Sequence, residues 1–412
     1  MEIGEPEPAA AAFADAERLF PGVAEISARR GEAAYLAGDD GAAEAALRRA
    51  LDRAPAHPRA FALLAELLHQ RADRPALDRL LQGAAHAGGA QAFRAASVLA
   101  GLDRRKEALD ALARAEIGAA PAPAVDMLAA DILREDGALG PALLRARAAA
   151  SRAPYDPSVN APLARLLLTT GAFQEAEGLA RRFSAAFPDN QLWRAFLWSA
   201  LASQGAAEAD ALLDFARDVL VADLSPPAPY PSIDAFNAAL AAELSPLHHA
   251  AGREPLGQSV HGGSQTRRPL QSLRSPALTA FFALARETAD GFASVLTPPP
   301  DHPGLGWRGK KATVAAAWSV ALAPGGRHSA HVHPAGAISS AYYVEAPGGA
   351  TSAGALALGE PPFPLPGHNG PRRLVDPVPG RLVLFPSYCW HGTAPFTAAG
   401  RRLTIAFDLV FR

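Results

Sequence analysis

The sequence predicts a multidomain protein in which an all-α solenoid precedes a β-rich domain of the sandwich or jelly-roll type with flanking helices. From about residue 23 to residue 220, apolar residues recur at helical spacing in a background of Ala, Leu, Arg and Glu. Residues 223–231 contain four prolines, which stop a helix and favour a stiff connector. From Val314 onward, short apolar segments alternate with Gly and Pro turns, as in all-β domains.

The helical part repeats itself. Gly137, Gly171 and Gly205 lie 34 residues apart, and the 99 residues from Gly38 to Gly137 fit three units of 33. Within the units, the glycine is followed at recurring offsets by small or apolar residues and then by a proline: Gly38 by Ala43, Ala50 and Pro55; Gly137 by Ala142, Ala149 and Pro154; Gly171 by Ala176, Phe183 and Pro188. An irregular all-helical domain is the alternative.

This pattern is similar to the tetratricopeptide repeat, in which a glycine lies in the turn between two antiparallel helices and a proline ends the second helix. The match is good in the three units just described and degenerate around Arg71 and Asp103, which lack the glycine or the closing proline. The resemblance implies a repeat domain over residues 20–222. Because such a solenoid usually holds an extended peptide or protein on its concave surface, we expect a protein or peptide partner there.

A proline-rich linker over residues 223–232 and a second domain over residues 233–412 follow. In the second domain we expect helices at 233–244 and 276–296, and strands at 314–323, 338–344, 381–385 and 401–411.

Composition excludes several classes of function. The formal net charge of −2 provides no field for nucleic acid or an anionic membrane. Cys389 is the only cysteine, so a disulfide within the chain and a cysteine-based zinc site are both excluded. The first residues lack the basic start and apolar core of a secretory signal, and no apolar run of about 18 residues occurs that could span a bilayer. We therefore expect a cytoplasmic protein.

Three histidines suggest a metal site. His331 and His333 are two residues apart, so on an extended strand their imidazoles project to the same face. His391 follows the apolar run 382–390, where an unpaired imidazole would be buried, and a metal ion is one candidate partner. The alternatives are a surface cluster for the first two residues and a backbone carbonyl partner for His391.

A second cluster lies on the last strand. Arg402 and Thr404 alternate on one face of a segment whose other residues are largely apolar. A buried arginine needs an anionic partner, and a planar guanidinium beside a hydroxyl suits a carboxylate. An internal salt bridge is the alternative.

These clusters, with the segments between them, resemble the iron(II)/2-oxoglutarate-dependent oxygenases of bacteria. The resemblance runs over residues 233–412 and rests on five segments: Gln258-Ser259 with Gly262-Gly263-Ser264-Gln265-Thr266, His331-x-His333-Pro334, Ser339 to Val344, Gly380 to Ser387 with His391, and Arg402 to Phe407. It implies a double-stranded β-helix, a jelly roll whose barrel mouth holds the metal.

The resemblance also implies roles for individual residues. His331, His333 and His391 would hold Fe(II), while Arg402 and Thr404 would anchor the distal carboxylate of 2-oxoglutarate. Of two adjacent tyrosines on one strand, we favour Tyr343 as a residue that contacts this cosubstrate, and we expect Tyr342 in the core. The protein would position the reactants and exclude water, so we assign no catalytic acid or base.

The sequence departs from the wider superfamily at one position. The usual triad is two histidines and one carboxylate, and His333 stands where that carboxylate is expected. Either the site has three histidines, or another carboxylate such as Asp376 replaces it, or the iron keeps an open position. The expected activity is a hydroxylase-type dioxygenase with a protein-binding repeat domain. The alternatives are an inactive scaffold and a three-histidine, cupin-like metalloenzyme that does not use 2-oxoglutarate. We also expect His248, His249 and Arg401 at the surface.

Overall fold

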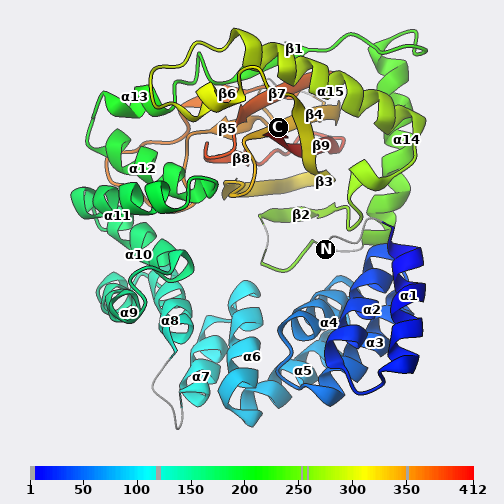
Figure 1. Cartoon of the computed structure of the whole chain (residues 1–412), viewed down its shortest axis with the longest axis vertical. Coiled ribbons are helices and arrows are strands. Elements are labelled where there is room, and N and C mark those ends of the chain that lie inside the picture. Colours follow the sequence, from blue (N-terminus) through cyan, green and yellow to red (C-terminus); the bar gives the residue numbers. More distant parts are fainter. Residues whose placement is uncertain (1–4, 117–121, 252–253, 258, 349–351) are drawn as a thin grey trace. The chain divides into compact units, whose positions relative to one another are not determined.

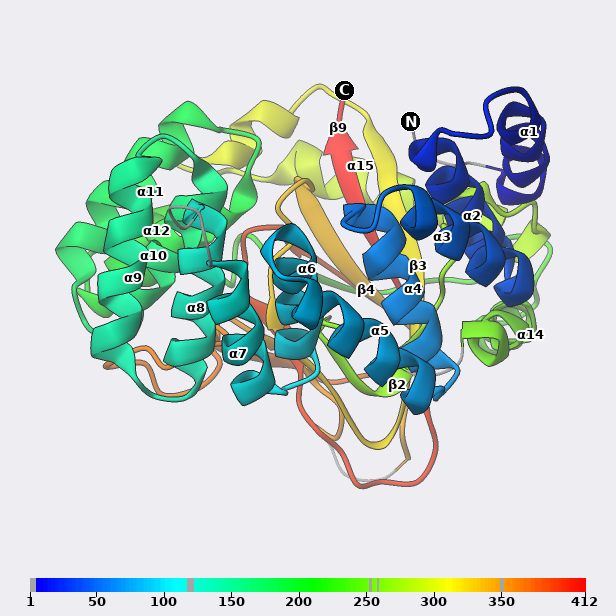
Figure 2. The same cartoon turned by 90° about the horizontal axis from the view of Figure 1, so that it is seen from below.

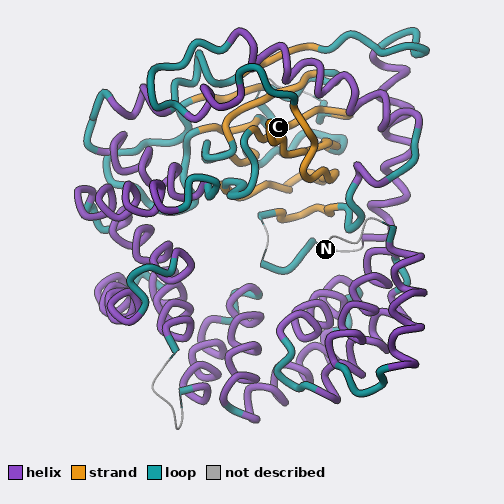
Figure 3. Tube along the Cα trace, in the orientation of Figure 1, coloured by secondary structure: helices purple, strands orange, loops and turns teal. Residues whose placement is uncertain are grey.

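The computed structural model describes residues 5–116, 122–251, 254–257, 259–348 and 352–412, and it divides into two compact units. The first unit comprises Met1–Pro162 with Ala250–Gln258, and the second comprises Leu163–His249 with Ser259–Arg412. Figures 1 and 3 show helices over the first half of the chain and strands concentrated in the second half. Among the described helices, none is both long and apolar enough to cross a membrane.

The first unit is a stack of antiparallel helix pairs (Figure 2). Its core is built largely from alanines and leucines, whose small size lets the helices approach closely. Several helices begin at an aspartate or at a proline in the first turn; Asp39 and Asp73, for example, accept hydrogen bonds from the backbone N–H groups of Ala42 and Ala76. The helices are α1 (Pro6–Leu19), α2 (Ala24–Ala37), α3 (Asp40–Arg53), α4 (Pro58–Gln70), α5 (Arg74–Ala87), α6 (Gly89–Gly101), α7 (Arg105–Ala115), α8 (Pro123–Glu135), α9 (Leu139–Arg152) and α10 (Pro157–Thr169).

The repeat is confirmed by the turns inside the helix pairs. Gly38, Gly137, Gly171 and Gly205 all adopt positive φ angles between 66° and 83°. The two degenerate units keep the same backbone, with Ala72 at φ 58° and Asp103 at φ 59° in the corresponding turns. A residue with a Cβ atom is strained there, so these units keep the tetratricopeptide-like geometry without its preferred glycine.

The second unit begins within α10 and includes the last helices of the solenoid. These are α11 (Phe173–Ala186), α12 (Gln191–Ser203) and the short α13 (Glu208–Leu212). Two longer helices follow, α14 (Ile233–Ala251) and α15 (Pro276–Val295), together with the 3₁₀ turns η1 (Leu270–Ser272) and η2 (Pro303–Trp307).

The strands of the second unit form one antiparallel nine-stranded sheet in jelly-roll fashion. The order is β1-β7-β4-β9-β3-β8-β5-β6, and β2 also pairs with β3. The long strand β3 pairs with two other strands. Its residues 312–322 pair with β9, and His328 and His331 pair with β8. The strands are β1 (Leu220–Asp223), β2 (Val260–Gln265), β3 (Ala312–His331), β4 (Ile338–Glu345), β5 (Leu356–Leu358), β6 (Arg373–Val375), β7 (Arg381–Pro386), β8 (His391–Thr393) and β9 (Arg402–Phe411).

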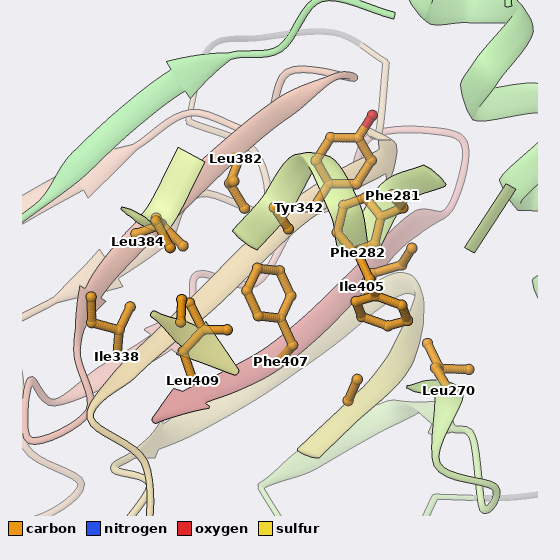
Figure 4. Close-up of a cluster of buried hydrophobic side chains, with 14 of the residues drawn as sticks. Leu270, Phe281, Phe282, Ile338, Tyr342, Leu382, Leu384, Ile405, Phe407 and Leu409 are labelled. Carbon is orange, nitrogen blue, oxygen red and sulfur yellow. The ribbon is translucent and has the colours of Figure 1, made fainter. Parts of the chain in front are cut away.

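One face of this sheet forms the main core of the second unit. Strands β4, β7 and β9 direct alternate apolar residues, such as Tyr342, Leu382 and Phe407, into one cluster with Phe281 and Phe282 of α15 (Figure 4). Helix α14 contributes Phe236, Leu240 and Leu244 to the same cluster. Phe281 of α15 packs against Tyr342 and Phe407, with ring centroids 4.8 and 5.7 Å apart. The predicted fold class, an all-α tetratricopeptide-type solenoid followed by a jelly roll with flanking helices, is confirmed.

The boundary between the two compact units lies at residue 162, whereas the sequence composition predicted a linker at residues 223–232. Strand β1 lies just before the prolines and pairs with β7, and Asp223 forms an ion pair with Arg381 at 2.7 Å. Strand β1 and helices α11 to α13 belong to the compact unit of the sheet, so the N-terminal stretch of the first unit ends at Pro162. The division at residues 222 and 233 stays a prediction.

Candidate functional site

The structure brings His331, His333 and His391, here called the histidine triad, together inside the jelly roll. His331 and His391 are direct cross-strand partners on β3 and β8, and His333 lies two residues beyond the end of β3. One ring nitrogen from each residue lies within 4.8 Å of those of the other two. The ring centroids of the triad are 4.3 to 5.0 Å apart. Strand pairing therefore places His331 opposite His391, and the segment that follows β3 brings His333 beside them.

Each imidazole of the triad is fixed from behind through its Nδ1 atom. His331 Nδ1 lies 2.8 Å from the Ser329 carbonyl oxygen, and His391 Nδ1 lies 3.0 Å from that of Cys389. Because a carbonyl oxygen only accepts, Nδ1 carries the proton in both rings and Nε2 keeps its lone pair. His333 Nδ1 lies 2.6 Å from a carboxylate oxygen of Asp408, which favours the same tautomer. The three side chains thus offer the unprotonated nitrogens that a metal ion requires.

Burial keeps His331 and His391 neutral. Burial, followed by the neighbouring His333, lowers the pKa of His331 to about 4. Burial, followed by the nearby His331 and His333, also holds the pKa of His391 well below its usual range. Neutral imidazole is the form that ligates metals, so near neutral pH the site is prepared to bind a cation.

Arg402 occupies the inner face of β9 and is almost completely buried. Its Nε donates to the Gly354 carbonyl oxygen at 2.9 Å, and its guanidinium lies 5.0 Å from the centre of the Tyr343 ring. Within the described part of the chain, no carboxylate forms an ion pair with Arg402. A buried cation without a counterion is costly, so the arrangement favours an external anion over the internal salt bridge considered above.

The triad and Arg402 line the same small cavity. Trp318 and Thr404 contribute to the wall of this cavity, which has a volume of about 30 Å³. Thr404 donates its hydroxyl hydrogen to the Val320 carbonyl oxygen at 3.3 Å, close to the upper limit for a hydrogen bond. The inner surface of the jelly roll therefore combines three imidazoles with an arginine that has no ion-pair partner among the described residues.

The two adjacent tyrosines lie on opposite faces of β4. Tyr342 belongs to the core cluster under α14 and α15, and its hydroxyl donates to Asn237 at 2.7 Å. Tyr343 faces Arg402, and among the described residues its buried hydroxyl has no hydrogen-bond partner. The structure therefore places Tyr343, and not Tyr342, beside the guanidinium, while its contact with a cosubstrate stays a prediction.

Several residues near the site were not anticipated. Asp408 lies behind His333, whereas Asp376 is outside the histidine group found among the described residues. His328, a fourth histidine, lines the cavity, and its Nε2 lies 2.8 Å from the hydroxyl of Ser259. Gln258, part of the upstream signature, lies outside the described residues.

Two surface expectations need correction. His248 is buried between the hydroxyls of Ser264 and Ser319, each 2.9 Å away, because α14 packs on the sheet; only His249 is exposed. Arg401 is only partly exposed, since it forms an ion pair with Glu345 at 2.5 Å.

Helix α12 holds both segments that carry the triad. The backbone N–H of Gln191 donates to the carbonyl oxygen of Pro334, the residue after His333, at 2.9 Å. The indole N–H of Trp390, the residue before His391, donates to Ser199 at 2.9 Å. A helix of the repeat array therefore supports the geometry of the site.

Residues 316–408 match the model of the family described as "Putative 2OG-Fe(II) oxygenase". The resemblance to this family is confirmed for that segment. It contains the whole triad, Arg402 and Asp408. No curated protein matches the chain.

Solved structures resemble each half of the chain. A prolyl-4-hydroxylase of Pseudomonas putida is 19% identical, with a TM-score of 0.34, and the match covers 48% of this chain and 96% of that one. A tetratricopeptide repeat protein of Parabacteroides merdae is 16% identical, with a TM-score of 0.35, and the match covers 46% of this chain and 76% of that one.

Proposed function

We propose that the protein is an Fe(II)/2-oxoglutarate-dependent dioxygenase that hydroxylates its substrate, with a helical repeat domain that binds a protein or peptide. The observation that carries the proposal is the shared cavity, in which three imidazoles lie beside a buried guanidinium without a counterion among the described residues. The family match over residues 316–408 supports the same conclusion.

In this proposal the histidine triad holds the iron through its Nε2 atoms, while Arg402 and Thr404 bind the distal carboxylate of 2-oxoglutarate. Iron with 2-oxoglutarate, when bound, supplies the oxidation of a substrate C–H bond by oxygen. The chain's own contribution is orientation: Ser329, Cys389 and Asp408 fix the three imidazoles, and Tyr343 supports the guanidinium from one side. The apolar cavity wall, including Trp318, excludes water from the reactants.

The repeat half enters the proposal as the part that recruits a protein or peptide, which is the usual use of such a solenoid. The division into a repeat domain at 20–222 and an oxygenase domain at 233–412 belongs to the proposal, as does a cytoplasmic location. A three-histidine enzyme that does not use 2-oxoglutarate is a second candidate, and the absence of a carboxylate from the histidine group among the described residues favours it.

The test is an anaerobic titration of the metal-free protein with Fe(II) and then with 2-oxoglutarate, followed by visible absorption. We expect a weak charge-transfer band that requires both additions and is lost in His391→Ala. Arg402→Met should weaken 2-oxoglutarate binding by about 100-fold or more, because a charge-assisted pair in a buried site is removed. Arg401→Met is the matched control, since the neighbouring arginine pairs with Glu345 outside the cavity.

Each outcome separates the candidates. Tight Fe(II) binding without a band on adding 2-oxoglutarate would favour the three-histidine enzyme. Failure of the wild-type protein to bind Fe(II) would leave the interaction scaffold.

A further inference from the structure

We propose that Asp408 is a positioning residue that supplies, through the Nδ1 atom of His333, the negative charge that a carboxylate ligand would otherwise bring to the iron. The inference rests on the proposed function, because it concerns the metal held by the histidine triad. Its basis is the contact of 2.6 Å between Asp408 Oδ1 and His333 Nδ1.

The carboxylate is held in place by a second set of hydrogen bonds. The Ser339 hydroxyl donates to Asp408 Oδ1 at 2.7 Å, and the hydroxyls of Ser339 and Ser387 lie 2.8 Å apart. Within the described chain, Asp408 forms no ion pair with lysine or arginine, and it is only 9% exposed. Among the described residues, His333 is therefore the titratable side chain in direct contact with this carboxylate.

Backbone packing leaves the pair little freedom. A Cβ atom at Gly336 would lie 2.6 Å from the Ser387 hydroxyl oxygen and 3.2 Å from Cβ and Cγ of Asp408. His333 is anchored by its backbone N–H, which donates to the Ser387 carbonyl oxygen at 3.1 Å, and its ring lies 5.2 Å from that of Trp318. The glycine thus allows the turn after His333 to approach β9 closely, which fixes the direction of the imidazole.

The physical role follows from charge. Three neutral ligands leave the charge of a bound dication uncompensated, whereas the usual triad of two histidines and one carboxylate compensates part of it. A carboxylate that accepts a hydrogen bond from the Nδ1–H group makes the imidazole a more basic ligand. Loss of such a partner typically costs about 10- to 100-fold in metal affinity. Asp408 would thus supply, from behind His333, the negative charge that is missing because His333 stands in place of a carboxylate ligand.

The test uses Co(II) as an air-stable probe and measures its affinity for the full-length, metal-free protein without 2-oxoglutarate. Asp408→Asn keeps the shape of the side chain and removes its charge, so we expect Co(II) affinity to fall by about 10- to 100-fold. Ser339→Ala removes the hydroxyl that contacts both Asp408 and His333 Nδ1 but leaves the charge, so its effect should stay within about 3-fold. Equal losses in the two variants would overturn the proposal in favour of a purely structural network.

A second background tests whether the charge acts through His333. In His333→Asp the imidazole that links Asp408 to the metal is absent. Asp408→Asn should therefore change Co(II) affinity by less than about 3-fold in this background, although it lowers affinity by about 10- to 100-fold in the wild type. Equal losses of affinity in both backgrounds would contradict the role through His333 Nδ1, and circular dichroism and thermal unfolding of each variant would identify a folding defect.

The outcome is independent of 2-oxoglutarate. A wild-type protein that binds Co(II) as tightly as Asp408→Asn overturns this inference alone. A wild-type protein that binds no Co(II) overturns the proposed metal site and this inference together.

Discussion

The two faces of strand β9 differ completely in chemistry although their residues alternate along one segment. Leu403, Ile405, Phe407 and Leu409 point into the apolar core beneath α14 and α15. Arg402, Thr404 and Asp408 point the other way, toward the cavity and the histidine triad. The apolar face anchors the strand, so that its polar face can keep charged groups buried at fixed positions. Stability and function are therefore separable residue by residue along this strand.

The largest expected effect lies on the apolar face. Phe407→Ala should lower the free energy of unfolding by about 3–5 kcal/mol, because it removes a fully buried ring that packs against Phe281 and Phe282. Urea unfolding followed by circular dichroism measures this loss. At low temperature, where the variant is folded, its Co(II) affinity should stay within a few-fold of wild type. A large loss of metal affinity in the folded variant would show that the two faces are coupled.

The polar side of the site should impose a pH dependence on the metal-free protein. Burial lowers the pKa of His331 to about 4 in the folded state, against about 6.5 in an unfolded chain. The unfolded chain therefore takes up this proton first as the pH falls, so stability is present above pH 6.5 and is lost on descending toward pH 4. At about 1.4 kcal/mol per pKa unit, His331 contributes a loss of about 3 kcal/mol.

Carboxylates also titrate at low pH, so the contribution of His331 is isolated by comparing variants. His331→Gln should lose less stability than wild type between pH 7 and pH 4, whereas His249→Gln, at an exposed position, should follow wild type. Chemical unfolding at several pH values measures the difference. Identical pH profiles for wild type and His331→Gln would contradict the buried, neutral state of this ring.

Substitution of Arg402 should affect ligand binding more than stability, whereas substitution of Phe407 should affect stability more than binding. Without a bound anion its guanidinium lacks a counterion among the described residues, so Arg402→Met should raise the free energy of unfolding of the ligand-free protein by about 1 kcal/mol. The same variant should lose 2-oxoglutarate binding. Arg401→Met, which breaks the ion pair with Glu345, should change stability by less than about 1 kcal/mol. A strong destabilisation by Arg402→Met would mean that this arginine stabilises the fold, in contrast to the anion-binding role proposed for it.

The smallest expected effect concerns the support that α12 provides. Ser199→Ala removes the acceptor for the Trp390 indole N–H and should cost about 1 kcal/mol of stability. Because Trp390 adjoins His391, we also expect a few-fold loss of Co(II) affinity. Ser203→Ala, on the same helix, serves as the control. Unchanged metal affinity in Ser199→Ala would limit the role of α12 to folding.

Local patterns predicted much of this molecule. The glycine spacing indicated the helix pairs, and alternation along β9 placed Arg402 and Thr404 on the same face of the strand. Those relations depend on neighbours a few residues apart, where the period of a helix or strand is decisive. The turns at Ala72 and Asp103 show that packing of adjacent helices imposes the same backbone even without glycine.

Long-range pairing accounts for what the sequence did not predict. Asp408 shares the parity of Arg402 and Thr404, so alternation alone could have placed it on the inner face. Its contact with His333, however, joins residues 75 positions apart and depends on how β4 and β9 are aligned. Strand β1 was likewise not predicted from the sequence, because it is short, follows helices and pairs with a strand near residue 382. His248 is buried only because α14 packs on the sheet.

The most direct test of the central claim is an anaerobic crystal structure of the full-length protein with Mn(II) and 2-oxoglutarate. Anomalous scattering locates the metal, and the electron density locates both carboxylates of the keto acid. We predict the metal within bonding distance of Nε2 of all three histidines and the distal carboxylate against Arg402. A metal bound elsewhere, or a keto acid that does not contact Arg402, would contradict the account.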